Sequence, residues 1–219
     1  MLVDITTALH TSTQRDYFAR MANDKVHCSE TAKLFDYDYW DGDRKYGYGG
    51  YRYDGRWNVV AKKIIEYYGI NSRSKVLDIG CGKGYLLYEI KKEMPGITIS
   101  GIDISQYAIE NAKDEIKPFI QQGKAQVLPF SDNSYDLAIS ITTLHNLYLP
   151  DLYSALKEVN RVSRKSFITV ESYRNEQEKY NLMCWQLTCE CFFTPLEWEF
   201  IFRQCGWGDE RDYEFIFFE

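Results

Sequence analysis

The chain has 219 residues, of which 45% are hydrophobic, 16% aromatic and 26% charged, and its formal net charge is −6 at pH 7. A chain of this length is most simply one domain with a substantial buried core, and its acidic balance argues against a nucleic-acid-binding protein. No segment approaches the run of about 20 apolar residues that a membrane span needs, and the first residues lack the pattern of a secretory signal.

Cysteine and histidine usage predicts a cytoplasmic protein without a metal centre. The six cysteines form no CxxC pair, and the chain has only three histidines. In a chain of this size we expect the cysteines to be reduced, buried thiols. No spacing typical of metal ligands is found.

The first part of the chain is expected to be helical and then irregular. Residues 1–34 have the pattern of short, weakly amphipathic helices, whereas residues 35–56 form a glycine-rich, aromatic loop. From Trp57 the segment WNVVAKKIIEYYG places its apolar residues near one helical face, and Gly69 ends that helix.

Short apolar strands then alternate with helices. This alternation predicts a parallel sheet with helices on both faces. Right-handed crossovers make such a sheet doubly wound, with the ligand at the carboxyl ends of the strands. The predicted strands are 75–79, 97–103, a segment within 119–128, 134–142 and 166–172, and the predicted helices between them are 85–94, 106–117 and 150–162.

The C-terminal part has one strong helix signal. Thr194 is the expected N-cap, Pro195 takes the first helical position and Glu197 completes a capping box. Residues 212–219 are predicted to close the chain as a strand. The segment 181–193 fits either a strand or a helix.

A glycine-rich turn follows the first predicted strand in the segment VLDIGCGKGYLL. Gly80, Gly82 and Gly84 let the backbone approach a ligand closely. Asp78 precedes them, and its carboxylate would repel a pyrophosphate and favour an ammonium or sulfonium group. Asp103 ends the second strand, where an acidic side chain accepts hydrogen bonds from both ribose hydroxyls. Together they indicate a phosphate-free nucleoside with an amino-acid end.

With these motifs the chain resembles the class I S-adenosylmethionine-dependent methyltransferases, specifically their small-molecule branch. The resemblance covers roughly residues 57–172 and is carried in order by VLDIGCGKG, GIDIS and QGKAQVLPFSDNSYDLAISITTLHNL. It implies a Rossmann-like, mostly parallel α/β sheet, S-adenosylmethionine as cofactor and S-adenosylhomocysteine as product. It further implies one compact domain, in which a lid-bearing N-terminal segment (1–56) precedes the cofactor-binding core (57–219).

The resemblance also assigns cofactor contacts by position. The glycine loop would line the methionine end, Asp78 would hold the amino group and Asp103 would bind the ribose. Many relatives have an acidic residue at the position of Lys124; a lysine cannot accept a hydrogen bond from the adenine amino group, so adenine recognition is expected to use the backbone. The remaining implied contacts are Cys81 in the glycine loop, Ile104 on the adenine face, Ala125 and Gln126 at its edge, and Ser140 near the methionine part.

The segment YWDGDRKYGYGGYRYDGRW lies where this family folds chain over its cofactor. Aromatic faces attract cations by about 0.5–2 kcal/mol, so we expect a lid that holds the sulfonium and excludes water. Arg56 would pair with the cofactor carboxylate, while Asp43 and Arg44 would contact a polar substrate. The alternative is a surface loop held by its own tyrosines. The tyrosines assigned to the lid are Tyr46, Tyr48, Tyr51 and Tyr53.

A hydroxyl acceptor would require a base that takes its proton. His145, just past the fourth predicted strand, is the first candidate, and the alternative is a histidine satisfied within its loop. Glu171 and Tyr173, at the end of the fifth strand, are the second choice.

The end of the fourth strand narrows the acceptor. It reads SITT, unlike the Asn/Asp-Pro-Pro-aromatic turn of enzymes that methylate exocyclic amines. We therefore expect a hydroxyl or amine of a small polar molecule, such as a sugar derivative, amino acid or secondary metabolite, without nucleic-acid or membrane partners. The alternatives are a protein or RNA methyltransferase, aminocarboxypropyl transfer or cyclisation in the same pocket, and a non-catalytic cofactor-binding module. The oligomeric state stays open.

Overall fold

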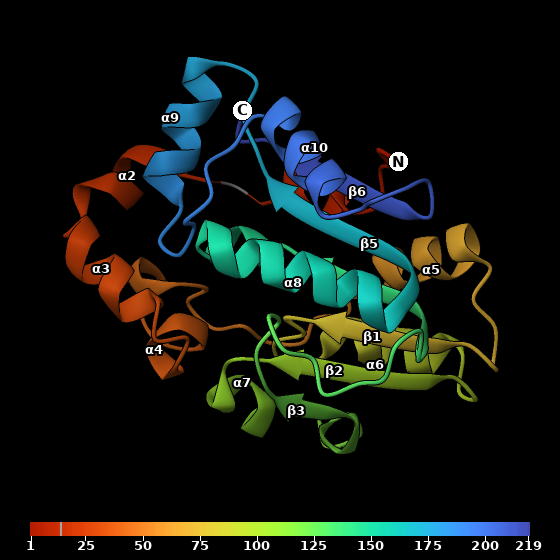
Figure 1. The fold of residues 1–219 in the computed structure, drawn as a ribbon. Helices are drawn as coiled ribbons and strands as arrows, with labels where there is room; N and C mark the ends of the chain where they lie inside the picture. Colours follow the sequence, from red (N-terminus) through yellow and green to blue (C-terminus); the bar gives the residue numbers. More distant parts are fainter. Residues whose placement is uncertain (14) are drawn as a thin grey trace.

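The computed structural model describes residues 1–13 and 15–219 and is built around one parallel sheet (Figure 1). Its strands are β1 (Lys75–Ile79), β2 (Thr98–Asp103), β3 (Ile120–Gln122), β4 (Tyr135–Ile141), β5 (Ser163–Glu171) and β6 (Arg211–Ile216). They lie in the order β3-β2-β1-β4-β5-β6, and each neighbouring pair is parallel. Because the strand order reverses between β1 and β4, the predicted doubly wound, Rossmann-like sheet is confirmed.

Helices cover both faces of this sheet. On one face α5 and α6 bury Ile64 and Ile90, and on the other α8 and α10 bury Leu156 and Trp198. The helices are α1 (Thr7–Thr11), α2 (Tyr17–Ala22), α3 (Lys25–Ala32), α4 (Tyr37–Trp40), α5 (Trp57–Tyr68), α6 (Tyr85–Glu93), α7 (Gln106–Glu110), α8 (Leu149–Val162), α9 (Glu176–Trp185) and α10 (Pro195–Gln204), with 3-10 turns η1 (Arg44–Tyr46), η2 (Lys117–Phe119) and η3 (Leu144–Asn146).

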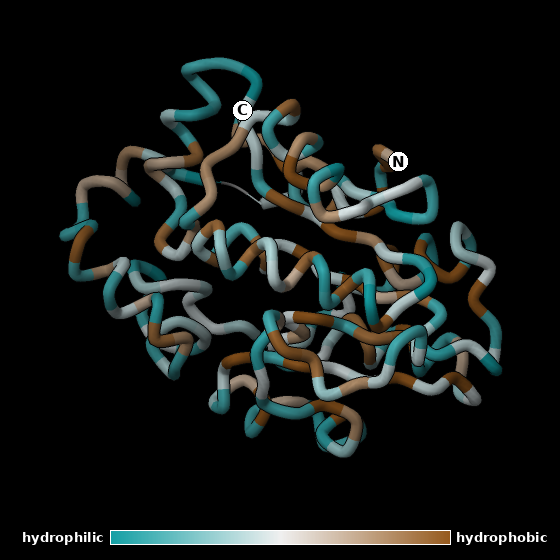
Figure 2. The backbone as a smooth tube through the Cα atoms, in the orientation of Figure 1, coloured by the Kyte–Doolittle hydropathy of each residue, from teal (hydrophilic) through white to brown (hydrophobic). Residues whose placement is uncertain are grey.

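The central strands are buried on both sides, which explains their nearly continuous apolar sequence. Val76 and Leu77 are neighbours in β1 but pack into the cores on opposite faces of the sheet. These strands are among the most hydrophobic parts of the chain, brown in Figure 2, whereas many of the connecting loops are teal.

The chain begins beside the last strand. Leu2 forms a parallel bridge with Tyr213 of β6, and the N-terminal ammonium lies 2.9 Å from the Asp212 carboxylate. The buried Glu214 carboxylate then accepts the main-chain N–H groups of Ile5 and Thr6 at 2.9 and 2.8 Å. The first residues are therefore anchored to the edge of the sheet before the chain turns into its N-terminal helices.

The N-terminal helices gather at one end of the sheet. Figure 1 shows α2, α3 and α4, together with α9, at the end toward which the arrows of β1 and β5 point. These helices therefore lie at the carboxyl ends of the strands, where ligands bind in open α/β sheets.

One segment differs from its sequence-based prediction, and the structure decides a second one that the sequence left open. The helix predicted for 106–117 ends at Glu110, and both the main-chain N–H and the side chain of Asn111 donate to the Tyr107 carbonyl, at 3.0 and 2.9 Å. The chain then bends so that Ile116 is fully buried against Gly84. The undecided segment 181–193 begins as the end of α9 and continues as an irregular loop. The capping box of Thr194 and Glu197 is confirmed at the start of α10.

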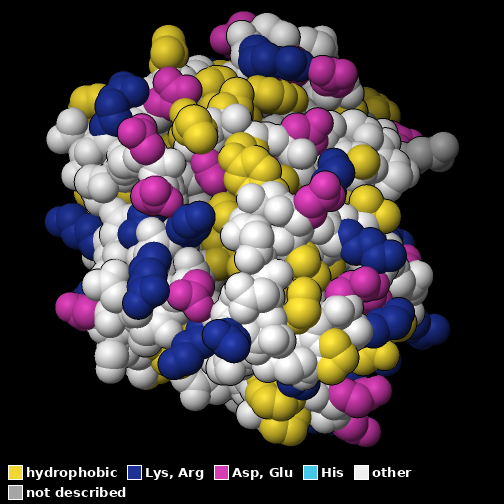
Figure 3. Space-filling model, turned by 90° about the vertical axis from the view of Figure 1, so that its right-hand side faces the viewer, with side chains coloured by type: hydrophobic (Ala, Val, Ile, Leu, Met, Phe, Trp, Pro, Cys, Tyr) yellow, Lys and Arg dark blue, Asp and Glu magenta, His cyan; other side chains and the backbone are white. Residues whose placement is uncertain are grey.

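The surface at the opposite end of the sheet mixes acidic and basic side chains, as Figure 3 shows. In the described residues no helix has the length and apolar character needed to cross a membrane. All six cysteines are buried free thiols.

Candidate functional site

The turn after β1 brings bare backbone to the carboxyl end of the sheet. Gly80 and Gly82 have φ values of 79° and 54°, in the left-handed region. A Cβ atom at Gly80 would lie 2.1 Å from Oγ1 of Thr143, and one at Gly82 would lie 2.8 Å from the Trp40 ring. Only glycine fits these positions, so the chain packs closely around a cavity of about 150 Å³ that both glycines line.

Two buried carboxylates reach the same cavity but have different surroundings. Asp103 accepts the N–H groups of Gly82 and Ser105 at 2.7 and 2.8 Å, and burial raises its pKa despite these bonds. Asp78 has no hydrogen-bond or ion-pair partner among the residues described, and burial, with the nearby Asp103 charge, raises its pKa to about 8. A bound cation would supply the partner that Asp78 lacks.

The far side of the cavity is formed by the chain after β2 and β3. Ile104 is 48% exposed and offers an apolar surface, and it lines the cavity together with Lys124, Ala125 and Gln126. The residues that the resemblance assigns to the nucleoside therefore border one space.

An aromatic wall of the cavity comes from residues 35–56 together with Tyr85 of α6. The Trp40 and Tyr48 rings stack with centroids 5.4 Å apart, and Tyr51 stacks on Tyr85 at 5.1 Å. Tyr48 and Tyr51 lie against each other at 4.6 Å. These residues line the cavity, so two of the four predicted lid tyrosines lie where an aromatic wall was expected.

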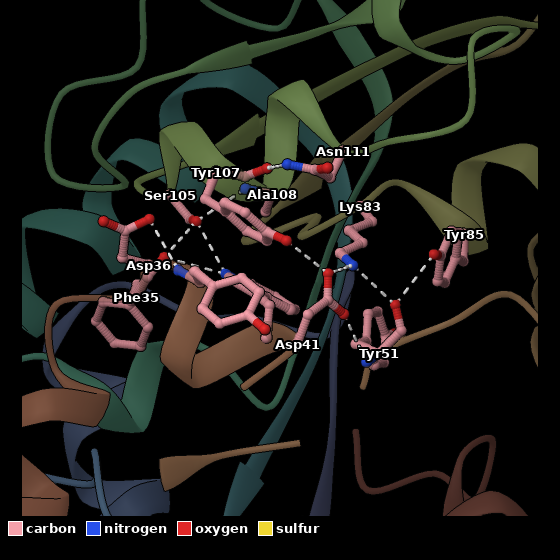
Figure 4. Close-up of polar contacts among 12 residues, drawn as sticks. Phe35, Asp36, Asp41, Tyr51, Lys83, Tyr85, Ser105, Tyr107, Ala108 and Asn111 are labelled. Carbon is pink, nitrogen blue, oxygen red and sulfur yellow. Dashed lines mark hydrogen bonds and ion pairs between the residues drawn. The ribbon is translucent and has the colours of Figure 1, made fainter. Parts of the chain in front are cut away.

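A polar cluster holds this N-terminal segment to the glycine loop (Figure 4). The Lys83 ammonium lies 2.6 Å from the Asp41 carboxylate and donates to the Tyr51 carbonyl at 3.0 Å. The Tyr107 hydroxyl donates to Asp41 at 2.8 Å. Burial raises the pKa of Asp41, but the bonds from Lys83 and Tyr107 outweigh it and lower the pKa overall. We call Asp41, Lys83 and Tyr107 the lid clasp.

A second, larger cavity of about 340 Å³ adjoins the first. The two cavities share Tyr39, Tyr48, Tyr51 and Tyr85 in their linings, so they meet along the aromatic wall. His145 and Glu171 also line the larger cavity. A ligand in one cavity would therefore lie beside a ligand in the other.

His145 and Glu171 form a buried pair in this larger cavity. His145 Nε2 lies 3.4 Å from Glu171 Oε2, while the other carboxylate oxygen accepts from the Gln186 side chain. Burial lowers the pKa of His145 to about 3 and raises that of Glu171 to about 8. Among the residues that the structure describes, His145 Nδ1 and Glu171 Oε2 have no hydrogen-bond partner. At neutral pH the pair is therefore uncharged, and these two atoms are available for hydrogen bonds to a ligand.

Several predicted site residues lie elsewhere. Arg56 borders the larger cavity but pairs with Asp54 at 2.6 Å rather than facing the glycine turn. The remaining ones outside both linings are Tyr46, whose hydroxyl contacts His27; Tyr53, bonded to Glu89; Asp43, which caps η1; Gly84, at the start of α6; Ser140, which donates to the Ile79 carbonyl; and Tyr173, against Lys179.

Sequence reasoning missed residues whose role depends on distant partners. Trp40 and Lys83 pack the lid against the glycine loop, and neither belongs to a motif that predicts this contact. Thr142 lines both cavities with a φ of 50°, which is rare for a β-branched residue and typical of strained functional sites. The sequence signal for Thr142 was the pair of threonines in SITT, at the end of β4.

Comparisons with known proteins agree with this geometry. Residues 70–217 match a family model described as a methyltransferase domain. The chain is 32% identical over 117 residues to the demethylmenaquinone methyltransferase of Staphylococcus aureus, covering 51% of this chain and 48% of that protein. It is 32% identical over 109 residues to a mitochondrial arginine-hydroxylase of Mus musculus, covering 49% of this chain and 31% of that protein.

The fold also resembles that of a putative methyltransferase of Haloferax volcanii, solved with a methyltransferase activator. The TM-score is 0.55 at 24% identity, and the match covers 67% of this chain and 66% of the other. The matched region spans half or less of the curated relatives described above.

Proposed function

Because the chain belongs to the methyltransferase domain family, we propose that it binds S-adenosylmethionine in the smaller cavity and methylates a small polar molecule held in the larger one. The single observation that carries this proposal is the buried, unpartnered Asp78 carboxylate beside a glycine turn. A carboxylate in that position suits the ammonium of an amino-acid end.

The residues around the smaller cavity fit the other parts of the cofactor. Each Asp103 oxygen accepts one main-chain hydrogen bond and retains a lone pair for a ribose hydroxyl. Ile104, Ala125 and Gln126 would border the adenine, and Tyr48 and Tyr51 would face the sulfonium. The bound cofactor supplies an activated methyl group; the protein positions the acceptor and excludes water.

The larger cavity favours a polar acceptor. The name of the staphylococcal relative gives demethylmenaquinone, an apolar quinone, as its substrate. Arginine, histidine and glutamate side chains line the larger cavity of this chain, which argues for a small molecule with a hydroxyl or amine. A hydroxyl sheds its proton when it is methylated. His145 is uncharged at neutral pH and is available to take it, and an ionised Glu171 would stabilise the resulting imidazolium.

We further propose that residues 1–56 act as a lid on the core formed by 57–219, and that the protein works in the cytoplasm, where its free thiols would stay reduced. The acidic net charge argues against a nucleic-acid substrate.

Calorimetry with S-adenosylhomocysteine tests the cofactor site. We expect binding by the unmodified chain and a loss of affinity of about 10- to 100-fold in Asp78→Asn and in Asp103→Asn, since each removes a charge-assisted hydrogen bond. Asp114→Asn is the matched control, because Asp114 is exposed and pairs with Lys117. The absence of binding, or equal binding by all variants, would refute the proposal.

Product analysis separates methyl transfer from other uses of the same pocket. Turnover should release S-adenosylhomocysteine. Release of methylthioadenosine would instead indicate transfer or cyclisation of the aminocarboxypropyl arm.

A further inference from the structure

Three arginines from separate N-terminal elements converge in the larger cavity. The guanidinium carbons of Arg15, Arg20 and Arg44 lie 5.6, 5.0 and 5.1 Å from the centroid of the Trp185 ring. All four residues line the cavity. We call them the arginine cluster.

The arginine cluster has no carboxylate partner among the residues described. Arg15 donates to the His10 and Thr13 carbonyls at 3.2 and 3.1 Å, and its buried Nε has no partner within residues 1–13 and 15–219. Arg20 donates to the carbonyls of Trp185 and Arg44, and Arg44 donates to the Gly47 carbonyl. Main-chain carbonyls orient the three groups but leave their charges uncompensated.

Two other arginines of this chain, Arg161 and Arg174, are paired differently. Arg161 contacts the carboxylates of Glu158 and Asp132, at 2.6 and 2.8 Å. Arg174 contacts Glu178 and Glu219 in the same way. Carboxylates are abundant in this acidic protein, so their absence from the arginine cluster distinguishes it from these pairs.

The titratable groups that face the cluster do not neutralise it. Glu171 is a buried carboxyl group that lines the same cavity, and burial raises its pKa to about 8, so it is mostly protonated at pH 7. The Asp54 carboxylate forms an ion pair with Arg56. His10 is neutral, because burial and the Arg15 charge lower its pKa to about 4; its Nε2–H donates to Phe217, so its Nδ1 accepts from Arg15 at 3.0 Å.

The three cations therefore repel one another in partly desolvated surroundings. Burial and then the Arg44 charge lower the pKa of Arg20 to about 10, and burial lowers the pKa of Arg15 and of Arg44. A bound anion would relieve this repulsion, and guanidinium groups match the forked oxygens of carboxylates and phosphates.

We propose that the methyl acceptor is an anion whose carboxylate or phosphate group is bound by Arg15, Arg20 and Arg44. This inference rests on the proposed function, because it takes the larger cavity as the acceptor site. The anionic group anchors the acceptor over Trp185, while the rest of the molecule extends past His145 and Glu171 to the aromatic wall of the donor cavity.

Matched probes test the charge requirement without knowledge of the acceptor. Benzoate and benzamide have nearly the same shape and differ in charge, and phenyl phosphate supplies the other anion. Each is titrated calorimetrically into the full chain with and without saturating S-adenosylhomocysteine. We expect both anions to bind at least about tenfold more tightly than benzamide, since charge-assisted bonds are the stronger ones. The anion that binds more tightly identifies whether the acceptor carries a carboxylate or a phosphate group.

Two cluster variants and one control assign the binding to these residues. Arg20→Gln and Arg44→Gln should each weaken anion binding about tenfold or more and leave S-adenosylhomocysteine binding within about twofold. Arg203→Gln should change neither, because Arg203 is exposed on α10 and only contacts Glu199.

The outcomes separate the two proposals. Benzamide binding as tightly as benzoate, no binding of either anion, or anion binding unchanged in both cluster variants overturns the anionic acceptor. Failure of the unmodified chain to bind S-adenosylhomocysteine overturns the methyltransferase proposal instead.

Discussion

The His145–Glu171 pair illustrates how burial sets the protonation of a site. Both side chains are almost fully buried and lie 3.4 Å apart. Water is the usual partner of a charged imidazole or carboxylate, so its exclusion favours the uncharged form of each group. Once Glu171 has lost its own proton to solvent, its carboxylate would stabilise the imidazolium that forms when His145 accepts a proton, which makes the two groups one acid–base unit.

Substitution of Glu171 by glutamine tests this unit. With an acceptor found by screening, kcat should rise with pH up to about 8, the pKa to which burial raises Glu171. Glu171→Gln should lower kcat by about 10- to 100-fold and abolish this pH-dependent rise. KM for the cofactor should stay unchanged, because Glu171 does not line the donor cavity.

Glu176→Gln is the control for that experiment, since Glu176 is exposed at the start of α9. A Glu171→Gln enzyme with the pH profile of the unmodified chain would show that Glu171 has only a structural role.

At the scale of elements, the lid depends on few polar contacts. The Lys83 side chain is 4% exposed, and its ion pair with Asp41 joins the lid segment to the glycine loop. Removing one partner of a buried ion pair leaves the other charge uncompensated, at a cost of about 3–5 kcal/mol. Much of that cost can be avoided if the lid opens and Asp41 reaches water.

Limited trypsin digestion detects such opening. In Lys83→Met, cleavage after Lys45 and Arg52 should be at least about tenfold faster than in the unmodified chain, because proteolysis tracks the population of the open form. Lys117→Met is the control, since Lys117 is exposed and pairs only with Asp114. Equal cleavage rates in both variants would contradict a clasp function.

Local sequence signals explain which elements could be predicted from sequence. The sheet, the helices on both faces and the capping box of α10 follow from local periodicity and caps, and the structure confirms them. The early end of α7 was missed because the chain after it bends to bury Ile116 against Gly84, a contact between segments that are distant in sequence.

In the candidate site, too, some residues could be placed from the sequence and others could not. Asp78 and the glycines are neighbours in sequence, so their proximity was predictable. The arginine cluster is not, because Arg15, Arg20 and Arg44 meet only when α2 and η1 pack beside Trp185 of α9. The sequence offered aromatic and basic residues in this region but no spacing that joins them.

At the scale of the whole molecule, the two cavities concentrate groups whose burial costs stability. Asp78 and Glu171 have pKa values raised to about 8, well above the values near 4 of exposed carboxyl groups. Their protonated forms are therefore favoured by folding, and that contribution is lost as the pH rises toward about 8. His10 and His145 have lowered pKa values, so their effect on stability is confined to pH values below about 6.5.

Between about pH 6.5 and 8, the two carboxyl groups therefore dominate the pH dependence among these four residues, and the ligand-free protein should lose stability as the pH rises. Thermal unfolding followed by circular dichroism measures this slope. Asp78→Asn should reduce it, because a neutral amide has no proton to lose, whereas Asp114→Asn should not. Saturating S-adenosylhomocysteine should also reduce it, since an ammonium beside Asp78 compensates the charge that appears at higher pH. If the melting temperature of the ligand-free protein is constant across this window, the Asp78 carboxylate already has a partner, and the electrostatic basis for cofactor binding is wrong.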